Sequence, residues 1–316
     1  MIGVVFLHEI SIPKNQNSFL TLHGFTNIDL PMQQSIDLLR RKLGEIYPPG
    51  EIIGFTRMIF ETLCGYTPTD ILLHKDTILS EDIHRKIERI TDRLSQQEPI
   101  QYILGYTDFC GRRFDIAPGA LIPRPETEEL RLVITENSGQ PSRIADLGTG
   151  SGCIAVTLAL SLPDSKIEAW DISTEALEIA QCNARKHNAH VNFFQRDILR
   201  YDVSELPEES LDIIVSNPPY IRRCESRSMS ANVLEYEPHI ALFVPNESPL
   251  LFYEKIAMDS VRLLSPGGKL YFEINETQGE ACARMLETAG YKHIRVIKDL
   301  YEKNRFVSAI KPIRHG

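Results

Sequence analysis

The sequence predicts a doubly wound α/β domain that follows a small helical domain. From about residue 125, strand-like runs alternate with longer helical runs, which is typical of a mostly parallel sheet covered by helices. Between residues 33 and 98, apolar residues instead recur at helical spacing. A glycine-rich turn at residues 148–152 joins a strand-like run to a helical one, at the sheet edge where such folds bind ligands.

The composition is that of a folded, acidic protein. The chain has 316 residues, 42% hydrophobic and 24% charged, which suggests about two domains. The net charge of −9 counts against tight binding to a phosphate backbone, so we expect no stable nucleic-acid complex. No run approaches the roughly 20 apolar residues of a membrane span, and the first residues lack the basic region of a signal peptide. We therefore expect a cytoplasmic protein without a membrane partner. The six cysteines have no zinc-site spacing, which predicts reduced thiols and no metal.

Residues 1–31 are treated as an uncertain N-terminal extension, because their apolar runs are broken by Gly, Pro and Asn and show no helical period. One hypothesis is that translation begins at Met32. A helical domain is predicted over residues 32–100, and Pro99 is expected to end it. Ser80 is expected to cap one of its helices. The first helix should begin just after Met32 and place four residues on one face: Ile36, Leu39, Leu43 and Ile46.

Residues 101–122 alternate aromatic and small residues with Gly breaks, which predicts a β-hairpin linker. The α/β domain is assigned to residues 123–316. Two strand-like runs follow each other at its end, at residues 294–300 and 306–310. They indicate an antiparallel final strand.

The glycine turn is the first candidate site. Gly148, Gly150 and Gly152 let the backbone turn tightly and approach a ligand, with Thr149 and Ser151 between them. The spacing G-x-G-x-G does not meet the pyrophosphate fingerprint of dinucleotide sites. Asp146 ends the preceding strand, where a carboxylate suits the positively charged methionine end of S-adenosylmethionine.

Two further acids follow the next strands. Asp171, with Ile172 beside it, could accept both ribose hydroxyls of the donor. The alternative for Asp171 is an acid near a helix N-terminus. Asp197 could accept from the adenine amino group, and Ile198 could pack on the ring. Together with the glycine loop, these acids favour an S-adenosylmethionine site over a nicotinamide site.

The fourth strand ends in Asn217, Pro218, Pro219 and Tyr220, beside the expected donor site. An NH2 group conjugated to an sp² carbon is a poor nucleophile and carries two N–H donors. The Asn217 side-chain oxygen can accept one and the Pro218 carbonyl the other, which would fix the nitrogen for methyl transfer. Tyr220 could pack over the flat acceptor group. The alternative is an Asn-Pro turn with no catalytic role.

These motifs resemble known enzymes. ADLGTGSG (residues 145–152) and SNPPY (216–220) are similar to class I methyltransferases that act on conjugated NH2 groups, which implies a seven-stranded sheet. The flanking segments resemble the release factor glutamine methyltransferases over about residues 33–312: EPIQYILG (98–105), residues 109–114, LIPRPETE (121–128), EYEP (235–238), Ala241-Leu242 and Asn304-Arg305.

The resemblance implies methylation of the side-chain amide N5 of the glutamine in the Gly-Gly-Gln motif of class 1 peptide chain release factors. It also implies that the helical domain helps to hold the release factor. Residues 217–220 would hold the glutamine, and Phe109, Pro123, Arg124 and Glu128 would wall its pocket. For the acids at 126 and 128, the alternative is ordinary helix-start residues after Pro125.

Three alternatives to this function remain, two of them enzymatic. An amino methyltransferase that acts on a nucleic-acid base is disfavoured by the acidic charge and by the flanking segments. A methyltransferase for another protein glutamine remains an alternative. A silent binding module would predict damage to the glycine loop or to residues 217–220, and both are intact.

Overall fold

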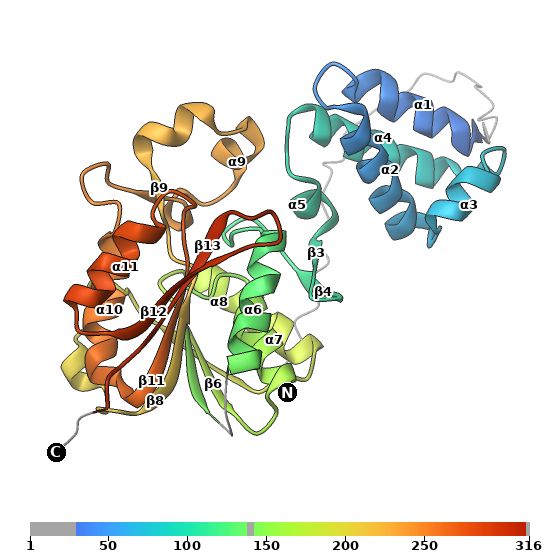
Figure 1. Cartoon of the computed structure of the whole chain (residues 1–316). Coiled ribbons are helices and arrows are strands. Elements are labelled where there is room, and N and C mark those ends of the chain that lie inside the picture. Colours follow the sequence, from blue (N-terminus) through green and yellow to red (C-terminus); the bar gives the residue numbers. More distant parts are fainter. Residues whose placement is uncertain (1–29, 138–141, 314–316) are drawn as a thin grey trace, which may run out of the picture.

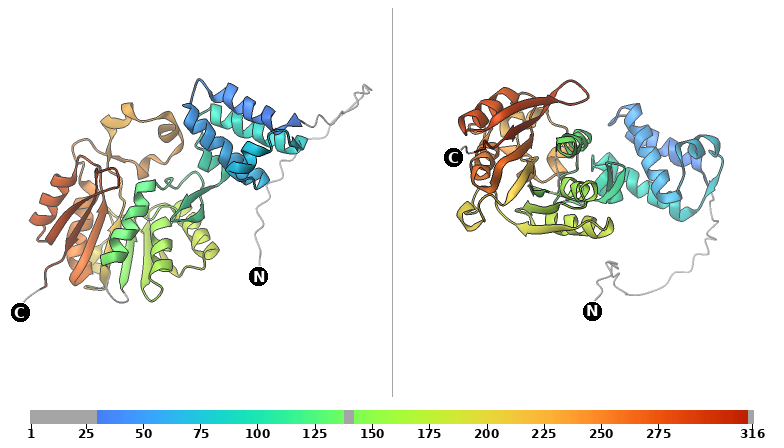
Figure 2. Two further views of the ribbon diagram at one scale, coloured as in Figure 1. Left: turned by 45° about the vertical axis from the view of Figure 1, so that its right-hand side comes forward. Right: turned by 60° about the horizontal axis from the view of Figure 1, so that its bottom comes forward.

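The computed structural model describes residues 30–137 and 142–313 and consists of a helical domain and an α/β domain (Figure 1). The extension predicted for residues 1–31 lies outside the described residues except for its last two. Both views of Figure 2 place the helical domain to one side of the sheet. How far each domain extends along the chain stays a prediction.

The helical domain packs its helices around one apolar core. Helix α1 begins at Met32, one residue before the predicted start, and Ser80 accepts a hydrogen bond from the Ile83 N–H at the start of α4, as predicted. Ile46 contradicts the expected face, because α1 ends before it and the side chain is 39% exposed. The elements are β1 (Leu30–Pro31), α1 (Met32–Leu43), α2 (Pro49–Cys64), α3 (Pro68–Leu73), β2 (Ile78–Leu79) and α4 (Glu81–Ser95).

The expected hairpin is shorter than the predicted linker. Its strands are β3 (Tyr106–Phe109) and β4 (Arg112–Asp115), which pair antiparallel. Residues 100–104 form the helix α5 (Ile100–Leu104), so Pro99 begins a helix instead of ending the bundle. The missing N–H of proline costs nothing at a helix start, and Gly105, with φ of 80°, ends α5 in the left-handed region.

The hairpin joins the two domains. On one side, the Thr62 and Tyr106 hydroxyls lie 2.9 Å apart and Arg113 pairs with Glu61 at 3.0 Å. On the other side, the Asn183 side chain exchanges two hydrogen bonds with the Asp115 backbone. Because these contacts run along both sides of the hairpin, they set how the helical domain lies against the α/β domain.

The α/β domain contains the predicted seven-stranded, mostly parallel sheet, in the order β12-β13-β11-β8-β5-β6-β7. The antiparallel final strand is confirmed, because β13 pairs antiparallel with both β11 and β12. The strands are β5 (Arg143–Leu147), β6 (Lys166–Asp171), β7 (Val191–Gln195), β8 (Leu211–Ser216), β11 (Leu264–Glu273), β12 (Lys292–Lys298) and β13 (Asn304–Ile310).

Helices cover both faces of this sheet. Ile144 and Val215 pack under α6 (Pro125–Asn137) and α7 (Cys153–Ser161). Ala145 and Ile214 point the other way, toward α10 (Leu251–Leu263) and α11 (Gly279–Thr288). This alternation explains why the strand-like runs are apolar throughout. The helix α8 (Thr174–Lys186) joins β6 to β7, and a 3₁₀ turn (Val203–Glu205) precedes β8.

An insert between β8 and α10 arches above the sheet (Figure 1). The Tyr236 hydroxyl donates to the Gln96 carbonyl of the helical domain at 2.8 Å, so the insert also touches that domain. The insert contains β9 (Ile221–Arg222), a 3₁₀ helix (Arg223–Ser228), α9 (Ala231–Tyr236), a 3₁₀ turn (His239–Ala241) and β10 (Phe243–Val244).

Candidate functional site

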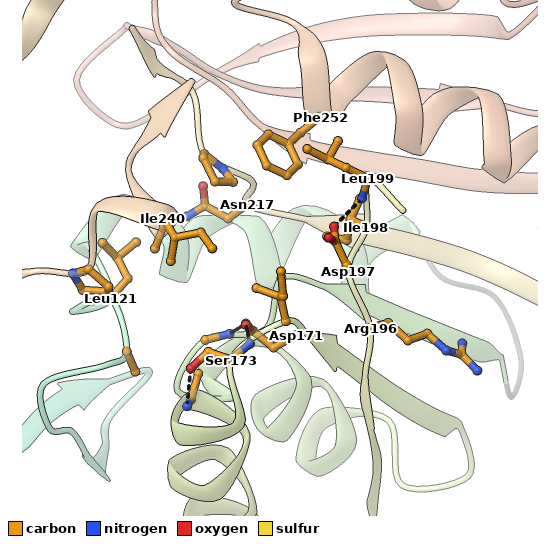
Figure 3. Close-up of a pocket in the computed structure, with 18 of the residues that line it drawn as sticks. Leu121, Asp171, Ser173, Arg196, Asp197, Ile198, Leu199, Asn217, Ile240 and Phe252 are labelled. Carbon is orange, nitrogen blue, oxygen red and sulfur yellow. Dashed lines mark hydrogen bonds between the residues drawn. The ribbon is translucent and has the colours of Figure 1, made fainter. Parts of the chain in front are cut away.

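A cavity of about 360 Å³ lies at the carboxyl ends of the central strands. Figure 3 shows Asp171 and Ser173 on one side, Asp197 to Leu199 with Phe252 beside them on a second side, and Asn217 and Ile240 facing them. Eight residues of the predicted site line it: Gly148, Gly150, Asp171, Ile172, Asp197, Ile198, Asn217 and Pro219. The sequence patterns therefore converge at one place.

The glycine loop is folded over the end of β6. The N–H groups of Gly148 and Thr149 both donate to the Trp170 carbonyl, at 2.8 and 2.9 Å. Gly148 and Gly150 have positive φ and present their backbone to the cavity. Gly152 instead allows the loop to pack closely on α8, because a Cβ there would lie 2.9 Å from the Cβ of Ala180. The Thr149 and Ser151 side chains are buried and do not line the cavity.

Asp146 lies beneath the loop and does not line the cavity, in contrast to its expected contact with the methionine end of the donor. It is fully buried and accepts from the Thr149 hydroxyl at 2.6 Å and from the Ala155 N–H at 3.2 Å. Burial raises the pKa of Asp146 to about 7, although these hydrogen bonds oppose the shift. Its contacts therefore tie the loop to the first turn of α7.

Asp171 presents its carboxylate to the cavity. One oxygen accepts from the Gly150 N–H at 2.8 Å and the other from the Ser173 N–H at 2.9 Å. Burial raises the pKa of Asp171, and the backbone hydrogen bonds oppose it. The cap of α8 is Ser173, whose hydroxyl accepts from the Ala176 N–H at 3.1 Å. Asp171 therefore fits both descriptions: it is an acid beside a helix N-terminus, and it also lines the cavity.

The third predicted acid, Asp197, and its neighbour Ile198 also line the cavity. Asp197 accepts from the Leu199 N–H at 2.9 Å, which fixes the turn after β7 (Figure 3). Ile198 is buried at the cavity wall. Arg196 also belongs to the wall, but its guanidinium lies over the Trp170 ring at 4.2 Å. A carboxylate beside an apolar side chain is suited to a flat ring that carries an amino group.

Asn217 follows β8 directly and is half-buried at the cavity. Its amide nitrogen donates to the Thr127 hydroxyl at 3.5 Å, and that hydroxyl donates to the buried Glu273 carboxylate at 2.8 Å. Pro218 is buried, and Tyr220 packs against the sheet core instead of lining the cavity. Sequence reasoning missed the roles of Thr127 and Glu273. The available signal was a single acid, Glu273, within the otherwise apolar run at residues 270–274.

The residues expected to wall the substrate pocket do not line this cavity. Phe109 is buried edge-to-face against Phe114, with ring centroids 5.9 Å apart, because the hairpin presses both rings toward α7 and α8. None of the four expected wall residues, Phe109, Pro123, Arg124 and Glu128, lines the described cavity. Glu126 and Glu128 occupy the first turn of α6, which agrees with the helix-start alternative.

Arg124 has a different partner, which sequence reasoning also missed. Glu237, only 4% exposed, accepts from the Arg124 guanidinium at 2.7 Å and from the Ile122 N–H at 3.2 Å. The chain on each side of this contact lines the cavity, at residues 119–121 and at 238, 240 and 241. One buried carboxylate therefore holds two walls of the cavity together, and we call this contact the Arg124–Glu237 pair.

Within residues 30–137 and 142–313, no group of three His, Cys, Asp or Glu side chains is arranged to hold a metal ion. No helix in these ranges is long and apolar enough to cross a bilayer. All six cysteines lie in these ranges and are free thiols.

Two family models match the chain: a methyltransferase small domain at residues 109–235 and a PrmC N-terminal domain at residues 40–105. Among curated relatives, the release factor glutamine methyltransferase of Bacteroides thetaiotaomicron is 49% identical over 86% of this chain and 97% of its own. That of Flavobacterium psychrophilum is 42% identical, with 84% and 94% covered. That of Streptococcus pneumoniae is 37% identical, with 83% and 93% covered.

Proposed function

The chain belongs to the release factor glutamine methyltransferase family, and from this premise we propose that it methylates the N5 amide of the glutamine in the Gly-Gly-Gln motif of class 1 release factors. The identity of 49% to a relative so named, over 86% of the chain, supports this substrate. The observation that carries the proposal is that Asn217 lines the same cavity as Gly150 and Asp171. An acceptor for an amide N–H therefore lies beside a site suited to a methyl donor.

The proposed donor is S-adenosylmethionine, which supplies an electrophilic methyl group on a sulfonium sulfur when bound. The cavity residues fit it. A carboxylate has about four acceptor sites, and Asp171 uses one on each oxygen for backbone N–H groups. One acceptor site on each oxygen is left, which matches two neighbouring ribose hydroxyls. Asp197 and Ile198 are the proposed contacts for the amino group and the face of the adenine.

The glutamine amide is the proposed acceptor. Its nitrogen is a poor nucleophile because its lone pair is delocalised into the carbonyl group. We propose that the Asn217 side-chain oxygen and the Pro218 carbonyl each accept one of its two N–H groups, so that the nitrogen is held toward the donor. These acceptors also stabilise the positive charge that develops on the nitrogen. Pro219 lines the cavity and stiffens the turn that carries both acceptors.

The helical domain is proposed to hold the release factor while the glutamine is in the site. A positioning role requires a fixed placement relative to the cavity. The hairpin contacts and the hydrogen bond from Tyr236 to Gln96 support such a placement. Release factors act at the ribosome, so the proposed place of the reaction is the cytoplasm.

A transfer assay tests the proposal. The full chain is incubated with methyl-labelled S-adenosylmethionine and an unmethylated class 1 release factor, and label on the protein is measured over time. A matched release factor, with glutamate in place of the motif glutamine, is the control. We expect label on the first and none on the second. Equal labelling of both factors would refute the proposed acceptor.

A further inference from the structure

We propose that Thr127 and Glu273 are positioning residues that set which end of the Asn217 amide faces the acceptor. This inference rests on the proposed function, because it assigns a task to groups behind the acceptor site. Neither side chain lines the cavity, so neither is expected to touch the donor. Their effect would pass through Asn217.

The fold brings the three residues together from distant parts of the chain. Strands β8 and β11 are parallel neighbours, and Ser216 is paired with Phe272. The next residues, Asn217 just after β8 and Glu273 at the end of β11, therefore lie side by side at the carboxyl edge of the sheet. Helix α6 covers this edge and places Thr127 in its first turn. Thr127 is 4% exposed and Glu273 only 1%, so water does not replace their contacts.

The hydrogen-bond chemistry gives the chain of contacts a direction. An ionised carboxylate can only accept, so the single hydroxyl hydrogen of Thr127 is donated to Glu273, at 2.8 Å. The Thr127 oxygen then has only lone pairs for Asn217, and it can pair with the NH2 end of that amide, at 3.5 Å. The Asn217 carbonyl oxygen is thereby turned away from Thr127 and is available to accept an N–H. A reversed amide would set two oxygens against each other and present NH2 to the NH2 of the substrate.

The arrangement depends on the charge of Glu273. Burial raises the pKa of this carboxyl to about 7. The side chains of Thr127 and Asn217 and the positive charge of Arg305 on β13 oppose the shift, and Glu126 on α6 adds to it. Tyr220, after β8, faces it without charge, and the Tyr253 hydroxyl of α10 donates to its backbone carbonyl at 3.0 Å. When Glu273 is protonated it can donate to the Thr127 oxygen, whose own hydrogen is then free to turn toward Asn217. The bias on the amide is lost, so turnover should fall as the pH falls through about 7.

Substitutions at Thr127 test the contact, with turnover of the full chain on a release factor as the readout. Thr127→Val keeps the shape and removes the hydroxyl; we expect kcat to fall by about 10- to 100-fold with donor affinity within about twofold. Thr127→Ser keeps the hydroxyl and should recover most of kcat. Thr157→Val is the matched control, because this buried hydroxyl has no partner among the described residues. Unchanged kcat in Thr127→Val, or equal losses in Thr127→Val and Thr127→Ser, would overturn the proposal.

A second readout needs no release factor, so it separates this proposal from the proposed function. The side-chain NH2 signals of Asn217, identified by their loss in Asn217→Ala, are followed by NMR against pH. We expect them to titrate near pH 7 in the unaltered protein and to lose that titration in Glu273→Gln, because a side-chain amide does not titrate in this range. Signals that do not titrate, or that titrate equally in Glu273→Gln, would refute the coupling. Absence of turnover on a release factor, with this titration intact, would instead count against the proposed function alone.

Discussion

Replacing Asp171 with asparagine should weaken donor binding by about 10- to 100-fold. In the structure, each carboxylate oxygen accepts one backbone N–H, from Gly150 or Ser173, and keeps one acceptor site for a ribose hydroxyl. Asparagine has only one oxygen, so its NH2 group would face one of these two N–H donors, that of Gly150 or that of Ser173. One ribose hydroxyl would lose its acceptor. A hydrogen bond to a charged group contributes about 1.5–3 kcal/mol, which is about one to two factors of ten in Kd.

Isothermal titration of S-adenosylmethionine into the purified chain measures this change. Asp202→Asn is the matched control, because Asp202 also accepts a backbone N–H, from Ser204 at 2.8 Å, but lies outside the cavity. We expect Asp171→Asn to raise Kd and the control to leave it unchanged. Turnover at saturating donor should remain, since Asn217 is not altered. An unchanged Kd in Asp171→Asn would refute the assigned ribose contacts.

Three further outcomes are expected. Asn217→Ala should lower kcat by about 10²- to 10³-fold while donor affinity is kept; single-turnover rates and titration calorimetry check this, and full turnover would exclude Asn217 as the acceptor of the amide N–H. Glu237→Gln should weaken the Arg124–Glu237 pair and speed donor dissociation by about tenfold, measured by stopped flow, whereas an unchanged rate would mean that the pair does not hold the cavity walls. Glu273 has a folded pKa of about 7 against an ordinary 4.5, so its contribution to stability is complete below pH 4.5 and is lost by about pH 7. Urea unfolding should show that Glu273→Gln removes about 3 kcal/mol of this pH dependence. The same dependence of the free energy of unfolding on pH in both proteins would contradict the raised pKa.

Residues at strand ends could be located from the sequence because a parallel sheet gathers them. Asp171, Asp197 and Asn217 each follow a separate apolar run, and the carboxyl ends of parallel strands meet at one edge. The glycine pattern located Gly148 and Gly150 for the same reason. The order and direction of the strands then followed from the alternation of runs, including the antiparallel β13.

Contacts that depend on packing between distant elements could not be located in this way. Periodicity does not say that Glu273 on β11 meets Thr127 on α6, 146 residues away in sequence. Asp146 was assigned to the donor because of its place before the glycine loop, yet its side chain points under that loop. Phe109 was assigned to the substrate wall, and the packing of the hairpin on α7 and α8 buries it instead. Ile46 keeps the helical spacing of α1, but the helix ends before it.

The most direct test of the account is to map the methylated atom. The full chain, methyl-labelled S-adenosylmethionine, an unmethylated class 1 release factor and total RNA are incubated together, and the products are examined by peptide and nucleoside mass spectrometry. The account predicts a gain of one methylene on the glutamine of the Gly-Gly-Gln motif and none on RNA. Label on an RNA base, or on a glutamine outside that motif, would contradict it.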